Sequence, residues 1–243
     1  AIGIVDRFVQ AQPMVDEGRS RLVDMYALSG NLARAIEVAR AGADLAPQNV
    51  FWAQRLGELL ATKGEFSAAA KEYDRAITMQ PSNPALFAAA ADARLNGKEA
   101  AEALAMLRSR NDLVTSTPVL RAYAALALSE TGRRDEAAVA ARESLVAARA
   151  SKTPDITTEE VLRVLRRMFP PERTADYEAL LTQAGAPTPL ECVTLAEAWT
   201  RAGPAGADKA IAWSDKTMAG GDKVPAPIRG GAMMARGTAL YSK

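Results

Sequence analysis

A period of 34 residues runs through the first part of this chain of 243 residues. Three residue types follow the period, each in its own phase. Glycine recurs at Gly30, Gly64 and Gly132, where the second interval is twice the first. Proline recurs at Pro13, Pro47 and Pro81, and alanine at Ala35, Ala69, Ala103 and Ala137. Abundant alanine alone could produce the third series, but not the other two at the same interval. We therefore interpret the chain as an array of structural repeats.

Within one repeat, these positions indicate where two helices begin and end. Glycine takes the left-handed backbone conformation without strain, so Gly64 predicts the turn between the helices. Proline cannot continue a helix, so Pro81 predicts the end of the second one. Asn83 and Pro84 then suit the N-cap and the first position of the next helix. The small side chain of Ala69 allows the two helices to pack closely.

The segment 50–83 carries the clearest copy of this pattern. The residues that carry the pattern are Leu56, Gly57, Leu60, Gly64, Ala69, Tyr73, Ala76 and Pro81. At these spacings the segment resembles a tetratricopeptide repeat. The resemblance implies an all-α, right-handed superhelix of helix-turn-helix repeats, an α-solenoid, with about 14 helices in the chain.

The repeat frame divides the chain into three parts. We expect a regular array over residues 1–151, an imperfect helical pair over 152–186, and degenerate repeats over 187–243. The array contains one partial and four whole repeats, at 1–15, 16–49, 50–83, 84–117 and 118–151. In the repeat frame, Ala1 takes the position of the alanine that packs in a second helix, and Pro13 ends that repeat. The last residues of the chain resemble an unfinished first helix. We therefore expect the chain to be a fragment of a longer array.

The segment that breaks the period contains an apolar helix and several arginines. Thr157 and Glu160 have the spacing of a capping box, which predicts that a helix starts there. The arginines are Arg163, Arg166, Arg167 and Arg173. They could contact a phosphate or an acidic partner, or they could form a solvated helix face balanced by neighbouring glutamates.

The composition argues against several classes of function. The chain has no histidine, so it lacks the commonest general base and metal ligand and every histidine-dependent triad. Its single cysteine, Cys192, falls on the apolar face of its expected helix, so we expect a buried structural thiol. A formal net charge of +1 gives no basic excess for binding nucleic acid. We expect no catalytic residue, no cofactor and no metal site.

The sequence indicates no membrane insertion and leaves the compartment open. It contains no apolar run long enough to span a bilayer, and its first residues lack the pattern of a signal peptide. Cytoplasm and periplasm both stay compatible with it. The alanine- and arginine-rich composition resembles that of bacterial proteins.

The resemblance also implies where a partner would bind. First helices line the concave groove of such arrays, and the candidate residues on that face are Arg21, Asp24, Phe51, Gln54, Arg55, Glu58, Asp92 and Tyr123. Asp24, Glu58 and Asp92 occupy the same position in three successive repeats. Such a row of charged side chains could hydrogen-bond an extended peptide or a helix. Alternatively, Arg21 could pair with Asp24, and Arg55 with Glu58, along their own helices.

Chaperone-binding members of the family hold a C-terminal carboxylate with a lysine and asparagine clamp. In this chain Asp24, Glu58 and Asp92 stand in place of the asparagines, and Ser20, Gln54 and Ala88 in place of the lysines. We therefore do not expect it to bind chaperone tails.

The function predicted from the sequence is a protein–protein interaction scaffold that binds a peptide or helix in its groove, without catalysis in this fragment. Two alternatives stay open: a regulatory or targeting region of a larger enzyme, and a component of an envelope or polysaccharide export assembly. The 34-residue period and the near-neutral charge disfavour RNA binding of the pentatricopeptide kind.

Overall fold

The computed structural model describes residues 2–11 and 16–242. These residues form fifteen α-helices and four short 3₁₀-helices, and no strand occurs among them. The all-α class and the helix-turn-helix solenoid are thereby confirmed, with a helix number close to the expected one. The chain forms two compact units, Ala1–Leu113 and Val114–Lys243.

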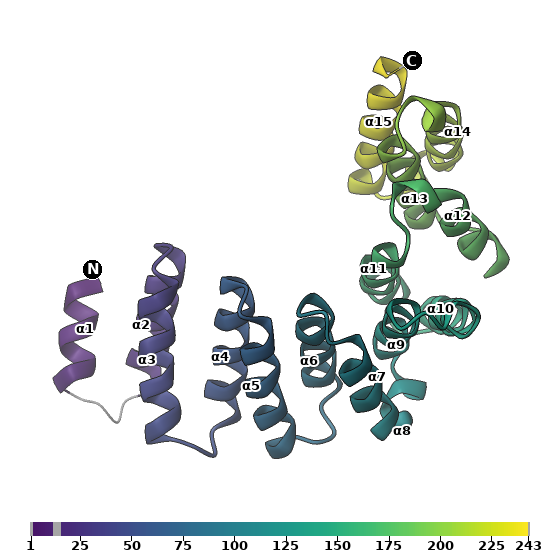
Figure 1. Ribbon diagram of the computed structural model, residues 1–243. Coiled ribbons are helices and arrows are strands. Elements are labelled where there is room, and N and C mark those ends of the chain that lie inside the picture. Colours follow the sequence, from purple (N-terminus) through teal and green to yellow (C-terminus); the bar gives the residue numbers. More distant parts are fainter. Residues whose placement is uncertain (1, 12–15, 243) are drawn as a thin grey trace. The chain divides into compact units, whose positions relative to one another are not determined.

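In the first unit, the successive helices α2 to α7 lie side by side as antiparallel neighbours (Figure 1). The helices are α1 Ile2–Ala11, α2 Asp16–Leu28, α3 Leu32–Leu45, α4 Val50–Lys63, α5 Phe66–Met79, α6 Pro84–Asn96, α7 Ala100–Ser109 and α8 Asn111–Ser116, the last of which ends in the second unit. Two second helices each pack against two first helices: α3 contacts α2 and α4, and α5 contacts α4 and α6. One apolar core therefore continues from repeat to repeat, from Leu22 to Ala93.

Helix starts follow the repeat frame. The helices α2, α4, α6 and α9 begin at Asp16, Val50, Pro84 and Pro118, where the frame places the repeat starts. The side-chain oxygen of Asn83 accepts a hydrogen bond from the backbone N–H of Ala85 at 3.1 Å, so the expected N-cap is confirmed. The division into three parts stays a prediction. Ala1 and Pro13, which indicate the partial first repeat, lie outside the described residues.

The turn inside each repeat requires the left-handed backbone conformation. Gly30, Gly64 and Gly132 have φ angles of 79°, 86° and 82°. The third repeat has no glycine at this position, and Lys98 takes the same conformation with φ 65°. This conformation costs a residue with a side chain about 1–2 kcal/mol. The packing of the array therefore overrides the local preference of Lys98.

Two glycines inside helices of the first unit make room for aromatic rings. A Cβ atom on Gly42 would lie 2.5 Å from the Trp52 ring, and one on Gly57 would lie 2.7 Å from the Tyr73 ring. Trp52 and Tyr73 are buried. The Trp52 indole donates a hydrogen bond to the Asp16 carboxylate at 3.3 Å. These glycines therefore set the distance at which neighbouring helices pack.

The second unit continues the helical pairs with less regular connections. Its elements are α9 Pro118–Glu130, α10 Arg134–Arg149, α11 Pro154–Leu165, η1 Arg166–Met168, η2 Pro171–Arg173, α12 Thr174–Gln183, α13 Pro189–Arg201, η3 Pro204–Gly206, α14 Ala207–Met218, η4 Gly221–Lys223 and α15 Ala226–Tyr241. The helix α11 contacts α9, α10 and α13, while α13 contacts α12, α14 and α15. The helix α13 is therefore central to the C-terminal part of this unit.

A buried ion pair connects α10 to the start of α13. The Glu191 side chain is fully buried and accepts hydrogen bonds from the Arg149 Nε and Nη2 atoms at 2.9 and 2.8 Å. Glu191 also accepts from the Thr188 backbone N–H at 2.8 Å, as part of a capping box. Arg149 further donates to the Ala184 carbonyl oxygen at 2.6 Å. This pair stabilises the segment in which the 34-residue period fails.

Two sequence predictions in this unit have opposite outcomes. The capping box expected at Thr157 and Glu160 is wrong, because α11 already begins at Pro154 and both residues lie inside it. Proline suits the first position of a helix, which explains the earlier start. The buried thiol expected at Cys192 is confirmed, and burial raises the pKa of that thiol.

Candidate functional site

Three candidate residues meet between the first helices of two successive repeats. Arg55 on α4 donates to the Asp24 carboxylate of α2 at 2.6 Å and to the Glu58 carboxylate at 2.9 Å. Gln54 donates to the other Glu58 oxygen at 3.0 Å. We call Asp24, Arg55 and Glu58 the charged triad. Its central guanidinium has one carboxylate from each helix, so the triad links α2 to α4.

The charged triad borders a pocket of about 390 Å³. The remaining lining is mostly apolar and comprises Ala27, Leu28, Leu32, Leu59 and Thr62. Leu28 is 89% exposed, so nearly its whole side chain faces solvent. Apolar surface next to fixed charges is typical of interaction sites, where a partner covers the apolar groups and pairs with the charges.

A third acidic residue, Asp92, lies on α6. The pKa of the buried Tyr73 hydroxyl is raised, first by burial and then by the charges of Glu58 and Asp92. Both carboxylates therefore lie close enough to act on one hydroxyl group. Asp92 accepts a hydrogen bond from the Asn96 amide at 3.1 Å. The position that Glu58 and Asp92 share in successive repeats thus brings them to the same part of the unit.

The other candidates in the first unit, Arg21 and Phe51, do not line this pocket. Arg21 pairs with Glu17 at 2.7 Å rather than with Asp24, whose partner is Arg55. The pairing of Arg21 with Asp24 is therefore wrong, whereas that of Arg55 with Glu58 is confirmed. Phe51 is 41% exposed and packs edge-to-face on Trp52, with ring centroids 4.9 Å apart.

Tyr123 differs from the other candidates. It lies on α9 in the second unit, and only 2% of its surface is exposed. A buried ring cannot contact a partner, so the interpretation of Tyr123 as a groove residue does not fit this structure. The equivalent position in α4 is Arg55, which is only partly buried, whereas Tyr123 is enclosed in the core.

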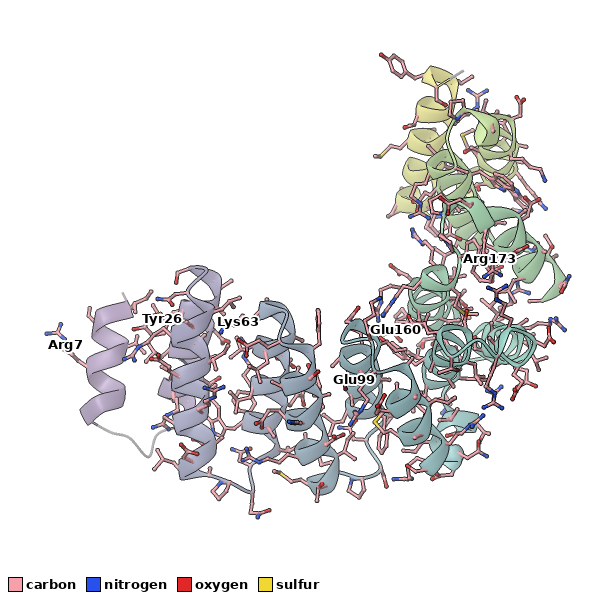
Figure 2. All side chains as sticks on the ribbon, viewed as in Figure 1. Arg7, Tyr26, Lys63, Glu99, Glu160 and Arg173 are labelled. Atoms are coloured by element: carbon pink, nitrogen blue, oxygen red, sulfur yellow. The ribbon has the colours of Figure 1, made fainter. Side chains whose placement is uncertain are left out.

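The arginines of the irregular segment also line a pocket, with a volume of about 480 Å³. Arg163, Arg166 and Arg167 contribute to it, but Arg173 does not. Figure 2 labels Arg173, which pairs with Asp176 at 2.8 Å and lies over the Phe169 ring at 5.4 Å. Arg201 from α13 completes the set of four arginines. Sequence reasoning missed Arg201, because it lies far along the chain from the cluster.

Two kinds of site were also sought among the described residues. They contain no group of three or more His, Cys, Asp and Glu side chains arranged to hold a metal ion. None of the described helices combines the length and the apolar composition needed to span a bilayer.

Comparisons with known proteins show resemblance at the level of structure. No family model matches the chain, and no curated protein matches it in sequence. A tetratricopeptide repeat protein from Parabacteroides merdae has a TM-score of 0.56 at 12% identity, with 96% of this chain and 91% of that chain covered.

Two further solved structures resemble the chain over most of its length. The Cut9-Hcn1 hetero-tetramer of the APC/C matches at a TM-score of 0.51 and 13% identity, covering 98% of this chain and 45% of that one. A thermophilic tetratricopeptide repeat protein of Thermus thermophilus matches at a TM-score of 0.50 and 15% identity, covering 93% and 100%. The helix-turn-helix order of this chain and its 34-residue period are consistent with these matches. The chain therefore has the fold of the tetratricopeptide repeat proteins.

Proposed function

We propose that this chain is a protein–protein interaction scaffold that binds a peptide or helical segment on the surface formed by α2 and α4. The bound segment carries a leucine-sized apolar side chain next to a lysine or arginine. The expectation that this part of the protein has no catalytic activity stays a prediction.

The observation that carries the proposal is the pocket beside the charged triad. Leu28 and Leu32 line it, and Leu28 is almost fully exposed. Covering exposed apolar surface contributes about 25 cal/mol per Å² removed from water. An apolar side chain from a partner would gain this contribution in the pocket.

The charges beside the pocket favour a basic partner. The guanidinium of Arg55 is shared by the carboxylates of Asp24 and Glu58, and Asp92 adds a third carboxylate nearby. The surface thus has more negative than positive charge. Complementary charge mainly increases the association rate and the specificity of binding. A lysine or arginine in the partner would meet this excess.

The fold is compatible with such a role. One matched structure, Cut9-Hcn1, is itself a hetero-tetramer, so a protein of this fold occurs in an assembly with a protein partner. The sequence alternatives, a regulatory region of a larger enzyme and an export component, would use the same surface and stay open.

The test uses short synthetic peptides that combine leucine with lysine or arginine, and a matched set in which glutamate replaces the basic residues. Fluorescence anisotropy should show binding of the basic set to the whole chain, with weaker binding in higher salt. The double variant Glu58→Lys/Asp92→Lys should lose affinity by about tenfold or more, because it reverses the charge excess.

Two further variants make the test specific. Leu28→Ser removes the apolar anchor and keeps the charges, so it should also weaken binding. Glu102→Lys reverses one acidic charge at an exposed position on α7, as each half of the double variant does, and should leave affinity unchanged. Circular dichroism verifies that each variant stays helical. Equal binding of the basic and acidic peptides, or equal loss in the Glu102 variant, would contradict the proposal.

A further inference from the structure

The arginine pocket of the second unit gathers like charges from separate elements. Arg163 belongs to α11, Arg166 and Arg167 to η1, and Arg201 to the last position of α13. Phe169 and Ala198 contribute apolar lining. Packing of α11 and η2 against α13 holds these elements together. The fold therefore brings four guanidinium groups to one pocket of about 480 Å³.

Negative charge in this pocket compensates only part of the positive charge on Arg166 and Arg201. Glu197 meets Arg166 through two long hydrogen bonds, of 3.3 and 3.4 Å. Arg201 makes no hydrogen bond or ion pair with any residue in the described part of the chain. Burial lowers the pKa of Arg201, the neighbouring charge of Arg166 lowers that pKa further, and the charge of Glu197 raises it. Glu197 thus provides one negative charge for two guanidinium groups, which repel each other, and a further anion would reduce this repulsion.

A buried hydroxyl group provides a second, independent observation. Tyr177 lines the same pocket, and its side chain is 1% exposed. Its hydroxyl has no hydrogen-bond partner of normal geometry among the described residues. Burial raises the pKa of the Tyr177 hydroxyl, and the nearby Thr194 hydroxyl, which donates to the Glu191 carbonyl oxygen at 2.9 Å, lowers it. An unsatisfied buried hydroxyl is costly, so it marks a place where a ligand oxygen would be accepted.

We propose that this pocket binds a phosphomonoester group through Arg166, Arg201 and the Tyr177 hydroxyl, with the organic part of the ligand against Phe169. The surplus of guanidinium groups and the unsatisfied hydroxyl carry this assignment. It concerns residues other than the charged triad, so the two proposals can fail separately.

A phosphomonoester matches the pocket in charge and in hydrogen-bonding capacity. It carries a charge of about −1.5 to −2 at neutral pH and offers three strong acceptor oxygens. Guanidinium groups present donors in a planar fork that suits phosphate oxygens. A carboxylate has one charge and two oxygens, so it would offer less to Arg166, Arg201 and the Tyr177 hydroxyl together. A phosphorylated side chain of a protein and a small organic phosphate share this chemistry.

Isothermal titration of the full chain with phenyl phosphate tests the proposal. Phenyl phosphate should bind with one-to-one stoichiometry, phenyl sulfate should bind more weakly because it carries one charge, and phenol should not bind. Arg201→Gln should lower the affinity for phenyl phosphate by about tenfold or more, since a charge-assisted contact is lost. Arg134→Gln, at an exposed position on α10, is the matched control and should change it less than about twofold.

Tyr177→Phe separates a binding role from a structural one. It removes a hydroxyl that has no hydrogen-bond partner of normal geometry among the described residues, so the melting temperature should stay unchanged or rise. Affinity for phenyl phosphate should nevertheless fall by about three- to tenfold. A tyrosine that serves only the core would leave the affinity unchanged, and that result would remove Tyr177 from the site.

Further ligands identify the source of the phosphate group and define the results that would contradict the proposal. A phosphotyrosine peptide that binds more tightly than phenyl phosphate would indicate a phosphorylated protein segment, and equal affinity would indicate a small organic phosphate. Absence of binding by phenyl phosphate and inorganic phosphate would overturn the proposal. Tighter binding of an unphosphorylated acidic peptide, or equal losses in the Arg134 and Arg201 variants, would overturn it as well.

Discussion

The charged triad of the first unit and the arginine pocket of the second unit are both built between packed helices, yet their charges are arranged differently. In the triad, Arg55 lies between two carboxylates at 2.6 and 2.9 Å. In the pocket, Arg201 lies beside Arg166 and has no ion pair among the described residues. The regular repeats thus pair opposite charges between α2 and α4, whereas the irregular segment brings like charges together.

The difference follows from how each region is held in place. Where the 34-residue period persists, equivalent positions of α2, α4 and α6 repeat at the same spacing, and small residues such as Gly57 set the helix distances. Where the period fails, the buried pair of Arg149 and Glu191 connects α10 to α13. A region held by such an ion pair can bring together arginines that regular repeats would keep apart.

The largest expected effect comes from removing one partner of this buried pair. Glu191→Ala leaves the Arg149 guanidinium buried without its carboxylate, which should cost about 3–5 kcal/mol of unfolding free energy. Glu37→Ala breaks a pair with Arg34 of similar length, 2.6 Å, on the exposed face of α3 and should cost less than about 1 kcal/mol. Urea unfolding followed by circular dichroism measures the unfolding free energies of both variants. Hydrogen exchange in α13 shows whether Glu191→Ala destabilises that helix. Equal costs would show that burial of Glu191 does not matter.

A second pair of variants tests the role of glycine in packing. Gly57→Ala forces a Cβ atom against the Tyr73 ring at 2.7 Å and should destabilise the first unit by about 1–3 kcal/mol. Gly237→Ala, inside α15, meets no atom within 4 Å and should stabilise the second unit by about 0.5–1 kcal/mol through helix propensity. Thermal unfolding measures both changes. The same sign for the two variants would contradict a packing role for Gly57.

The smallest expected effect concerns the third repeat. Lys98→Gly relieves the left-handed conformation at φ 65° and should stabilise the first unit by about 1 kcal/mol at most. Gly64→Lys, at φ 86° in the second repeat, should destabilise it by about 1–2 kcal/mol. The two substitutions make the third repeat more regular and the second less so. If Lys98→Gly has no effect on the urea midpoint, the turn at Lys98 is unstrained.

Residues with a periodic role could be predicted from the sequence, because a repeat imposes the same backbone requirement at each copy. The starts of α2, α4, α6 and α9 and the turns at Gly30 and Gly64 follow from this. Lys98 could be located as the missing glycine, although its conformation could not be predicted from its own preference. The Arg55–Glu58 pair is local, three residues apart on one helix, and was predicted for that reason.

Contacts between side chains from different helices could not be predicted. Asp24 pairs with Arg55 of the next repeat instead of with Arg21, because the relative rotation of α2 and α4 decides which side chains meet. Arg201 joins Arg166 only through the packing of α13, which no period indicates. The capping box of Thr188 and Glu191 was recognisable in the sequence as a threonine followed three residues later by a glutamate. The ion pair between Glu191 and Arg149 could not be recognised in the sequence.

The central claim is that the surface beside the charged triad binds a segment with an apolar and a basic side chain. It is tested most directly by recording amide chemical shifts of the labelled chain while a leucine- and lysine-containing peptide is added. The account predicts the largest changes around Asp24, Leu28 and Leu32 and around Arg55 to Thr62, with the α11–α13 amides unchanged. Changes confined to α11–α13, or no changes at saturating peptide, would contradict it.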